Sequence, residues 1–125
     1  MTHFFVIFLG GGLGAGLRHL TGLAALRLFG PGFPWGTFIV NVVGSLIMGI
    51  FIALLGRKIQ ATNELRLLVA TGFLGGFTTF SAFSLDVVVM WERGANTTAF
   101  IYVVASVLLS LLAVFAGLWL VRSIT

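Results

Sequence analysis

The sequence predicts an all-α integral membrane protein, a single domain of four transmembrane helices over residues 1–125. Hydrophobic residues make up 59% of the chain and charged residues 8%, a balance that a small soluble domain could not bury in one core. A transmembrane helix needs about 20 mainly apolar residues. Four stretches of the chain meet this requirement, at residues 4–26, 35–55, 65–90 and 98–121.

Short polar or helix-breaking segments separate these predicted spans. Residues 30–34 read Gly-Pro-Gly-Phe-Pro, residues 56–64 are mostly polar, and residues 92–97 have the composition of a turn. The first span is too long for a signal peptide and has no cationic region before it. We therefore expect this span to remain in the mature protein.

The third predicted span is interrupted by glycines and hydroxyl side chains. Residues 72–81 read Gly-Phe-Leu-Gly-Gly-Phe-Thr-Thr-Phe-Ser, in the middle of an otherwise apolar helix. Backbone groups released from a helix at membrane depth find no water, so a break survives only where it is buried in protein or lines a polar space. We therefore predict that the third helix is broken mid-membrane, at a transport site.

The cations are divided almost equally between the two ends of the predicted bundle. They lie mainly at span ends, as lipid headgroup anchors do, so the net charge of +4 does not indicate a nucleic-acid partner. Because the two ends carry nearly equal numbers of cations, neither orientation of the chain in the membrane is strongly preferred. This favours dual topology and an antiparallel homodimer. The two groups are Arg57, Lys58, Arg66 and Arg122 beside the termini, and Arg27, Arg93 and the deeper Arg18 opposite.

Small residues four positions apart favour close helix packing. This spacing is common in membrane helices and serves contacts within one subunit as well as contacts between subunits, and both alternatives remain open. The pairs are Gly10 and Gly14, Gly12 and Gly16, Ser45 and Gly49, and Gly72 and Gly76.

The chain lacks the residue groups that enzymes use. There is no cysteine, His3 and His19 lie at the ends of the first span, and Glu64 and Glu92 lie in loops. Nucleophile, base and metal sites need such side chains within reach of one another. We therefore expect no enzymatic activity.

Two ionisable residues lie within or near membrane depth, where a charge is expensive. Arg18 follows the glycine-rich segment of the first span. Its guanidinium group either attracts an anion or reaches out to the interface between membrane and water. Asp86 lies in the second half of the third span, and we expect it to pair with an arginine or a loop amide.

Uncharged polar and aromatic residues form a candidate anion pathway. Asn41 lies about two turns into the second span and either bonds another helix or presents its N–H donors to an anion. Phe80 and Phe83 share one helical face, and aromatic ring edges carry partial positive charge. Hydroxyl groups that could complete this surface are Thr79, Ser81 and Ser84, with Tyr102, Ser106 and Ser110 in one stripe on the fourth span.

These segments together resemble the Fluc (CrcB) fluoride channels. The resemblance rests on the glycine-rich first span ending in Arg18, on residues 41–45 with Gly49, and above all on residues 72–81 with Phe83. It covers nearly the whole chain. Members of the family are antiparallel dual-topology dimers with two fluoride pathways, each built from both subunits.

The resemblance also implies a set of site residues. By this resemblance, a structural sodium ion at the dimer centre would be held by the backbone carbonyls of Gly75 and Thr78, a set of oxygen ligands that suits a hard cation. Family members usually have threonine where this chain has Ala82. The implied fluoride pathway consists of Asn41, Phe80, Phe83, Ser110, Tyr102, Ser106 and Thr37, beside the candidates Thr79 and Arg18.

The function implied is passive fluoride export through a bacterial inner membrane, with fluoride, sodium, lipid and a second copy of the chain as partners. The main alternative is a small multidrug-type transporter, which is also a four-helix dual-topology dimer. Such transporters use a membrane-embedded glutamate in the first span, and the first span here has no acidic residue.

Overall fold

The computed structural model describes residues 1–57 and 62–124, which form four helical spans. Lys58, one of the cations used in the topology argument, lies outside the described residues. The third span is divided into four pieces, one of them a π-helix. The elements are α1 (Thr2–Phe29), α2 (Trp35–Arg57), α3 (Asn63–Arg66), the π-helix η1 (Leu67–Leu74), α4 (Gly75–Phe77), α5 (Ser81–Glu92) and α6 (Asn96–Ile124).

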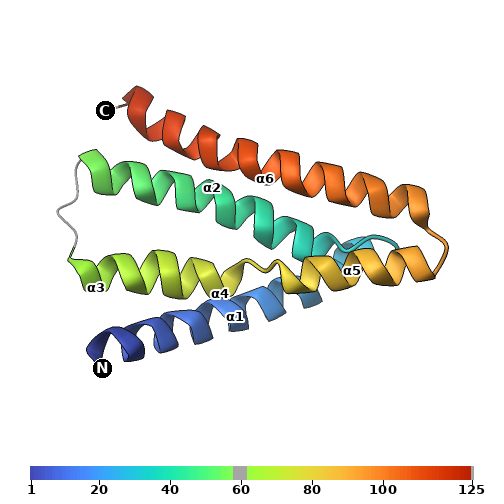
Figure 1. Ribbon diagram of the computed structural model, residues 1–125, viewed down its shortest axis with the longest axis horizontal. Helices are drawn as coiled ribbons and strands as arrows, with labels where there is room; N and C mark the ends of the chain where they lie inside the picture. Colours follow the sequence, from blue (N-terminus) through green and yellow to red (C-terminus); the bar gives the residue numbers. More distant parts are fainter. Residues whose placement is uncertain (58–61, 125) are drawn as a thin grey trace.

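The four spans are long and apolar enough to cross a membrane, which confirms the predicted fold of a multi-pass membrane protein. Each helix reaches a little beyond the predicted range, as in α1, which begins at Thr2 and ends at Phe29. Both termini lie at the same end of the molecule, as an even number of spans requires (Figure 1). The loop between α1 and α2 and the turn between α5 and α6 lie at the opposite end.

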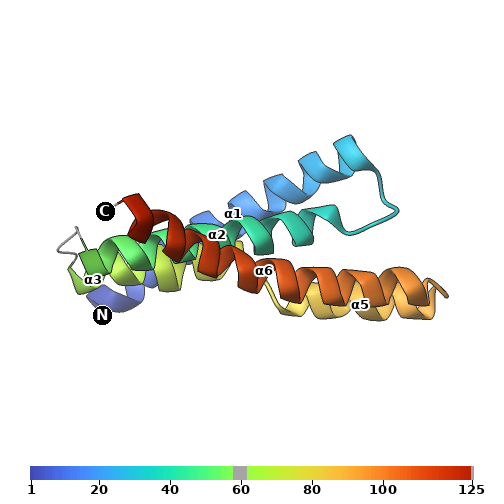
Figure 2. The same ribbon diagram turned by 90° about the horizontal axis from the view of Figure 1, so that it is seen from above.

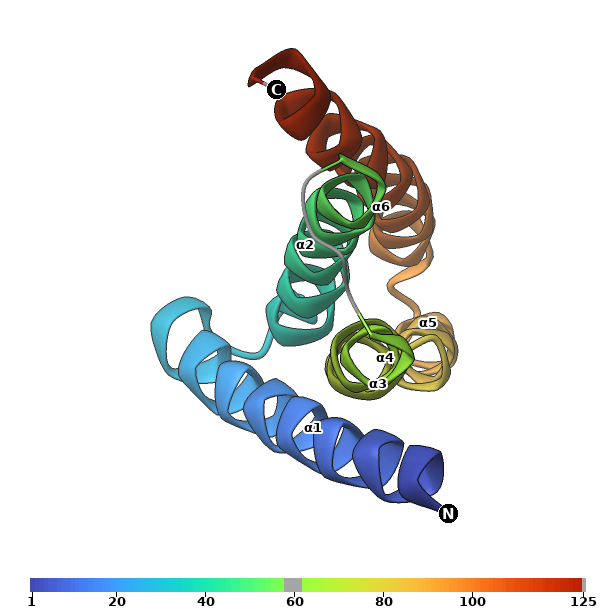
Figure 3. The same cartoon turned by 90° about the vertical axis from the view of Figure 1, so that its left-hand side faces the viewer.

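The helices are arranged around the divided third span. The contact between α2 and α6 is the most extensive, followed by that between α1 and η1. Seen end-on, α1 crosses below the third span at a clear angle to it, while α2 lies between α1 and α6 (Figure 3). In the view from above, the end of α1 and the start of α2 diverge from α5 and α6 (Figure 2).

Glycines permit the closest helix contacts. A β-carbon added at Gly14 would overlap the carbonyl oxygen of Phe73 in η1, and one added at Gly117 would overlap the backbone of α2. In contrast, an added β-carbon at Gly12 or Gly16 would meet no other atom within 4 Å. The Gly10 and Gly14 pair therefore packs within the chain, whereas Gly12 and Gly16 leave an open surface.

Most of the apolar surface points outward. In the most apolar window of each span, only 11 to 22% of the residues are buried inside the chain. Large side chains such as Phe8 on α1 and Phe115 on α6 are more than half exposed. A water-soluble protein could not expose so much apolar surface, so lipid or further protein must cover it.

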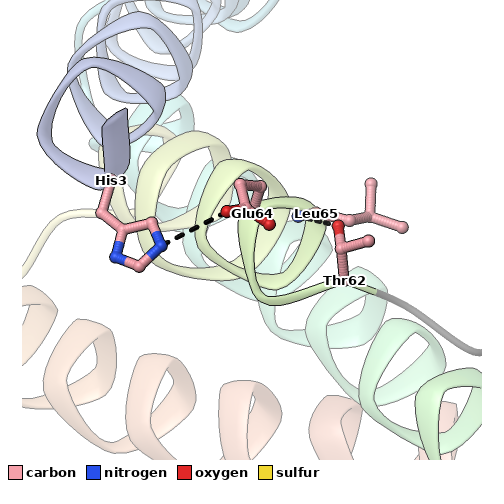
Figure 4. A network of polar contacts seen from close by, with 4 residues as sticks. All are labelled: His3, Thr62, Glu64 and Leu65. Carbon is pink, nitrogen blue, oxygen red and sulfur yellow. Dashed lines mark hydrogen bonds and ion pairs between the residues drawn. The ribbon is translucent and has the colours of Figure 1, made fainter. Parts of the chain in front are cut away.

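At the end that carries the termini, a polar contact joins the first and third spans. His3 Nε2 lies 3.4 Å from Glu64 Oε1, and both side chains are about half exposed (Figure 4). The Thr62 hydroxyl caps α3 by accepting a bond from the Leu65 amide at 3.1 Å. The His3–Glu64 contact places the start of the third span beside the start of α1.

Candidate functional site

The break in the third span separates α4 from α5 at residues 78–80. Thr78 is extended, with φ −86° and ψ 161°, so the helical hydrogen-bond ladder stops there. The Leu74 carbonyl still accepts two bonds, from the Thr78 amide at 3.0 Å and from the Thr78 hydroxyl at 2.9 Å. The sequence prediction of a mid-span break is confirmed, and the preceding π-helix was not foreseen.

Asn41 on α2 satisfies the backbone of this break. Its Oδ1 accepts a bond from the Thr79 amide at 2.8 Å, and its Nδ2 donates to the Thr79 carbonyl at 3.0 Å. The side-chain amide thus pairs with Thr79 as a neighbouring backbone peptide would. The Thr79 hydroxyl in turn accepts a bond from the Ala82 amide at 3.1 Å, which caps the start of α5.

Arg18 acts on the other side of the break. Its Nε donates to the Gly76 carbonyl at 3.1 Å, and the side chain is half-buried. Gly76 lies near the end of α4, where carbonyl groups lose their helical partners. The structure therefore places Arg18 on a backbone carbonyl, and Arg18 lines neither of the two cavities described below.

A first cavity of about 380 Å³ lies between α2, the break, α5 and α6. Six of the predicted pathway residues line it together: Asn41, Thr79, Phe80, Phe83, Ser106 and Ser110. The Ser106 hydroxyl is buried and is the one buried side-chain polar atom in the described part of the chain with no hydrogen-bond partner. A buried orphan hydroxyl is unfavourable unless a ligand bonds it.

Sequence reasoning missed several residues of the first cavity. Ser45 lies one turn beyond Asn41 on the same face of α2, so helical spacing could have identified it. Thr78 was predicted only as a carbonyl ligand. The other lining residues that were not predicted are apolar or glycine and carried no separate signal: Gly44, Met48, Val107, Leu111 and Val114.

The two phenylalanines at the cavity differ in their surroundings. Their ring centroids are 5.6 Å apart at an angle of 45°. Phe83 is 7% exposed and packs on the ring of Tyr102, with centroids 5.0 Å apart, whereas Phe80 is 77% exposed. Phe80 precedes α5 and lies in the break. One of the two rings therefore points out of the single chain.

A second cavity, of about 300 Å³, lies near the loop between α1 and α2, and Thr37 and Asp86 are among the residues that line it. Tyr102 is fully buried and lines neither cavity. Its hydroxyl donates to Asp86 Oδ2 at 2.9 Å. The expectation that Asp86 pairs with an arginine or a loop amide is wrong, because the Asp86 carboxylate instead accepts a hydrogen bond from the buried Tyr102 on α6.

The two predicted sodium ligands lie at the break with their carbonyls available. None of the hydrogen bonds found in the described residues ends on the carbonyl of Gly75 or Thr78, and Gly75 is exposed. No group of three His, Cys, Asp or Glu side chains in the described part of the chain could hold a metal ion.

The fold and the first cavity define a multi-pass membrane protein with a candidate pathway of uncharged polar and aromatic groups. Residues 5–118 match the family model described as "CrcB-like protein, Camphor Resistance (CrcB)". The chain belongs to this family, which confirms the resemblance found in its motifs.

Several relatives match over nearly their whole length. A protein of Chelativorans sp. (strain BNC1) is 60% identical over 124 residues, and one of Mesorhizobium japonicum is 57% identical, with 99% of each chain covered. A protein of Sphingopyxis alaskensis is 52% identical over 99% of this chain and 98% of its own. All three are named "Fluoride-specific ion channel FluC", and channels are not enzymes, in agreement with the expectation of no enzymatic activity.

We predict that Asn41→Leu destabilises the break, because it leaves the amide and carbonyl of Thr79 without partners. Each orphaned buried group costs about 1–3 kcal/mol. Amide hydrogen exchange on the purified protein should show faster exchange at residues 78–82 than in the wild type. Ser45→Ala, one turn away in the same cavity, is the matched control and should leave this exchange unchanged. Equal protection in Asn41→Leu would show that Asn41 does not hold the break.

Proposed function

We propose that this protein is a fluoride-selective channel. The observation that carries the proposal is the first cavity, which brings an amide, two aromatic rings and hydroxyl groups together at a break in a membrane helix. The relatives named fluoride-specific channels support the identity of the ion. The multidrug alternative has no comparable support, because the described part of α1 offers no carboxylate for proton exchange.

The chemistry of the cavity suits a small, strongly hydrated anion. One N–H of the Asn41 amide is used by Thr79, and Nδ2 carries a second that remains for a ligand. The Ser106 hydroxyl can donate, and the edges of Phe80 and Phe83 carry partial positive charge. No full positive charge lines the cavity. Binding is then weak enough for the ion to leave as well as to enter, as conduction requires.

Passive conduction is sufficient for export. Hydrogen fluoride enters from acid surroundings and releases fluoride in the more neutral cytoplasm. A membrane potential that is negative inside drives an anion outward by about 2.3 kcal/mol per 100 mV. The protein would act in a bacterial plasma membrane, as the sources of its relatives suggest.

The functional unit would be an antiparallel homodimer. Phe80 is exposed in the single chain although its partner ring Phe83 is buried, so one wall of the first cavity is incomplete. Gly12 and Gly16 also leave room for close approach of another helix. A second, inverted copy packed against the break would complete the cavity and give two equivalent pathways.

A structural sodium ion would lie on the two-fold axis of this dimer. Gly75 and Thr78 of each copy would supply carbonyl oxygens, two from each chain, which suits a hard cation. Their carbonyls have no hydrogen-bond partner among the described residues, so a cation would satisfy them.

Fluoride efflux from liposomes tests the channel directly. With a potassium ionophore to balance charge, the purified protein should release fluoride rapidly, as read by a fluoride electrode, and should release negligible chloride. Comparable chloride release would contradict selectivity. If no fluoride is released, the variant Ala82→Thr separates two causes. Recovery of fluoride efflux would show that Ala82 causes the loss, and no efflux from this variant either would overturn the proposal.

Dual topology predicts partial labelling at both ends of the bundle. The chain has no cysteine, so Thr2→Cys and Asn96→Cys each introduce a single reactive thiol, at opposite ends of the molecule. In intact cells, a membrane-impermeant maleimide should label about half of each variant, because both orientations coexist. Full labelling of one variant and none of the other would establish a single orientation.

The sodium proposal predicts a dimer that depends on the cation. Purification with N-methylglucamine in place of sodium should shift the protein toward monomer in analytical ultracentrifugation, and sodium should restore the dimer while lithium or potassium at the same concentration should be less effective. A dimer of equal stability without sodium would contradict this site.

A further inference from the structure

The two cavities share two helices, α2 and α5, and the second cavity is otherwise lined by α1 and by the loop before α2. Residues three or four positions apart on a helix share a face, one turn from each other. On α2, α5 and α6, one member of such a pair lines the first cavity and the other lies at or beside the second. The pairs, with the first-cavity member first, are Asn41 and Thr37, Phe83 and Asp86, and Ser106 and Tyr102.

Tyr102 therefore stands between the two cavities. Its ring packs on Phe83, which lines the first cavity, and on Phe33, which lines the second, with centroid distances of 5.0 and 5.3 Å. Its side chain is completely buried. On a route from Ser106 in the first cavity to Thr37 in the second, an anion would pass this phenol group.

The direction of the hydrogen bond at Tyr102 matters for an anion. An ionised carboxylate has no proton, so Asp86 can only accept, and the phenol has one proton to give. While Asp86 is charged, that proton is committed to Oδ2. Tyr102 then has no proton left to donate to an ion in the pathway.

The charge of Asp86 is also uncompensated. In residues 1–57 and 62–124, the one close contact between a basic and an acidic side chain joins His3 and Glu64, at the end of the molecule that carries the termini. Asp86 is half-buried, and the hydroxyl of Tyr102 is its hydrogen-bond partner. A negative charge without a cationic partner repels an approaching anion, and the repulsion is stronger where water is partly excluded.

From this arrangement we infer that Asp86 is a positioning residue that restrains anion passage between the two cavities. Its carboxylate accepts the hydrogen bond of the Tyr102 hydroxyl, so that the phenol proton cannot bond the ion. It also places a negative charge at the second cavity. The inference rests on the proposed fluoride channel, because it requires an anion that uses this route. Asp86 thus repels the anion, whereas the hydrogen-bond donors in the first cavity attract it.

The charge is tested by fluoride efflux from liposomes at neutral pH. Asp86→Asn keeps the shape of the side chain and removes its charge, so efflux at low ionic strength should rise by roughly threefold to tenfold. Asp86→Glu keeps the charge and should stay near the wild-type rate. Glu92→Gln removes a charge from the exposed end of the same helix and is the matched control, with no change expected.

Ionic strength separates an electrostatic role from a structural one. An inert potassium gluconate background should accelerate wild-type efflux by screening Asp86, and should have little effect on Asp86→Asn. Equal rates and equal salt dependence in the two proteins would overturn the inference. Loss of efflux in Asp86→Asn would overturn it as well, because a barrier cannot be required for conduction. An inactive wild type would overturn the proposed function, and this role of Asp86 with it.

A spectroscopic measurement tests the hydrogen bond without any transport. Tyr102 is the single tyrosine of the chain, so the infrared C–O stretching band of ring-deuterated tyrosine reports this phenol alone. Asp86→Asn should shift the band, because an amide oxygen accepts less strongly than a carboxylate. Glu92→Gln should not shift it. An unshifted band in Asp86→Asn would show that Asp86 does not hold the proton, even if efflux is normal.

Discussion

The bond pair between Asn41 and Thr79 is the interaction on which the rest of the site depends. At membrane depth, an amide and a carbonyl released from a helix have no water to bond, and each would cost several kcal/mol. Asn41 supplies one acceptor and one donor, at 2.8 and 3.0 Å, to the residue where the third span stops being helical. A carboxylate or an apolar side chain at this position could not satisfy both groups.

Once the break is stable, its other features follow from the lost helical geometry. The extended Thr78 redirects the chain, so Phe80 points outward while Phe83 stays buried. Gly44 faces Thr78 and Phe77 from α2, where any larger side chain would collide with them. The carbonyls of Gly75 and Thr78 are left without helical partners, and Arg18 satisfies the carbonyl between them, that of Gly76. A cavity with an amide and several hydroxyl groups in its lining thus forms without any charged side chain.

Much of this arrangement could be predicted from the sequence, because it depends on local composition. Apolar runs fix the four spans, and the glycines and hydroxyls of residues 72–81 locate the break. The partners of polar groups could not be predicted in the same way. Asn41 meets a residue 38 positions away, and Tyr102 meets Asp86 across 16 positions, and only the packing of α2, α5 and α6 brings them together. Asp86 was expected to pair with an arginine or a loop amide, because a buried charge usually needs such a partner.

The single chain leaves one wall of the first cavity and two backbone carbonyls uncovered, and this constrains its mechanism. Phe80 is 77% exposed beside the buried Phe83, and the carbonyls of Gly75 and Thr78 have no hydrogen-bond partner among the described residues. In lipid, these carbonyls need a polar partner, and the exposed ring needs a surface to pack against. A second copy related by a two-fold axis offers both, since it presents the same ring and the same carbonyls. If the axis lies in the membrane plane, the two copies have opposite orientations, and the two equivalent pathways run in opposite directions through the membrane. Such a dimer as a whole has no built-in direction, so the concentration gradient and the membrane potential together would determine which way the anion moves.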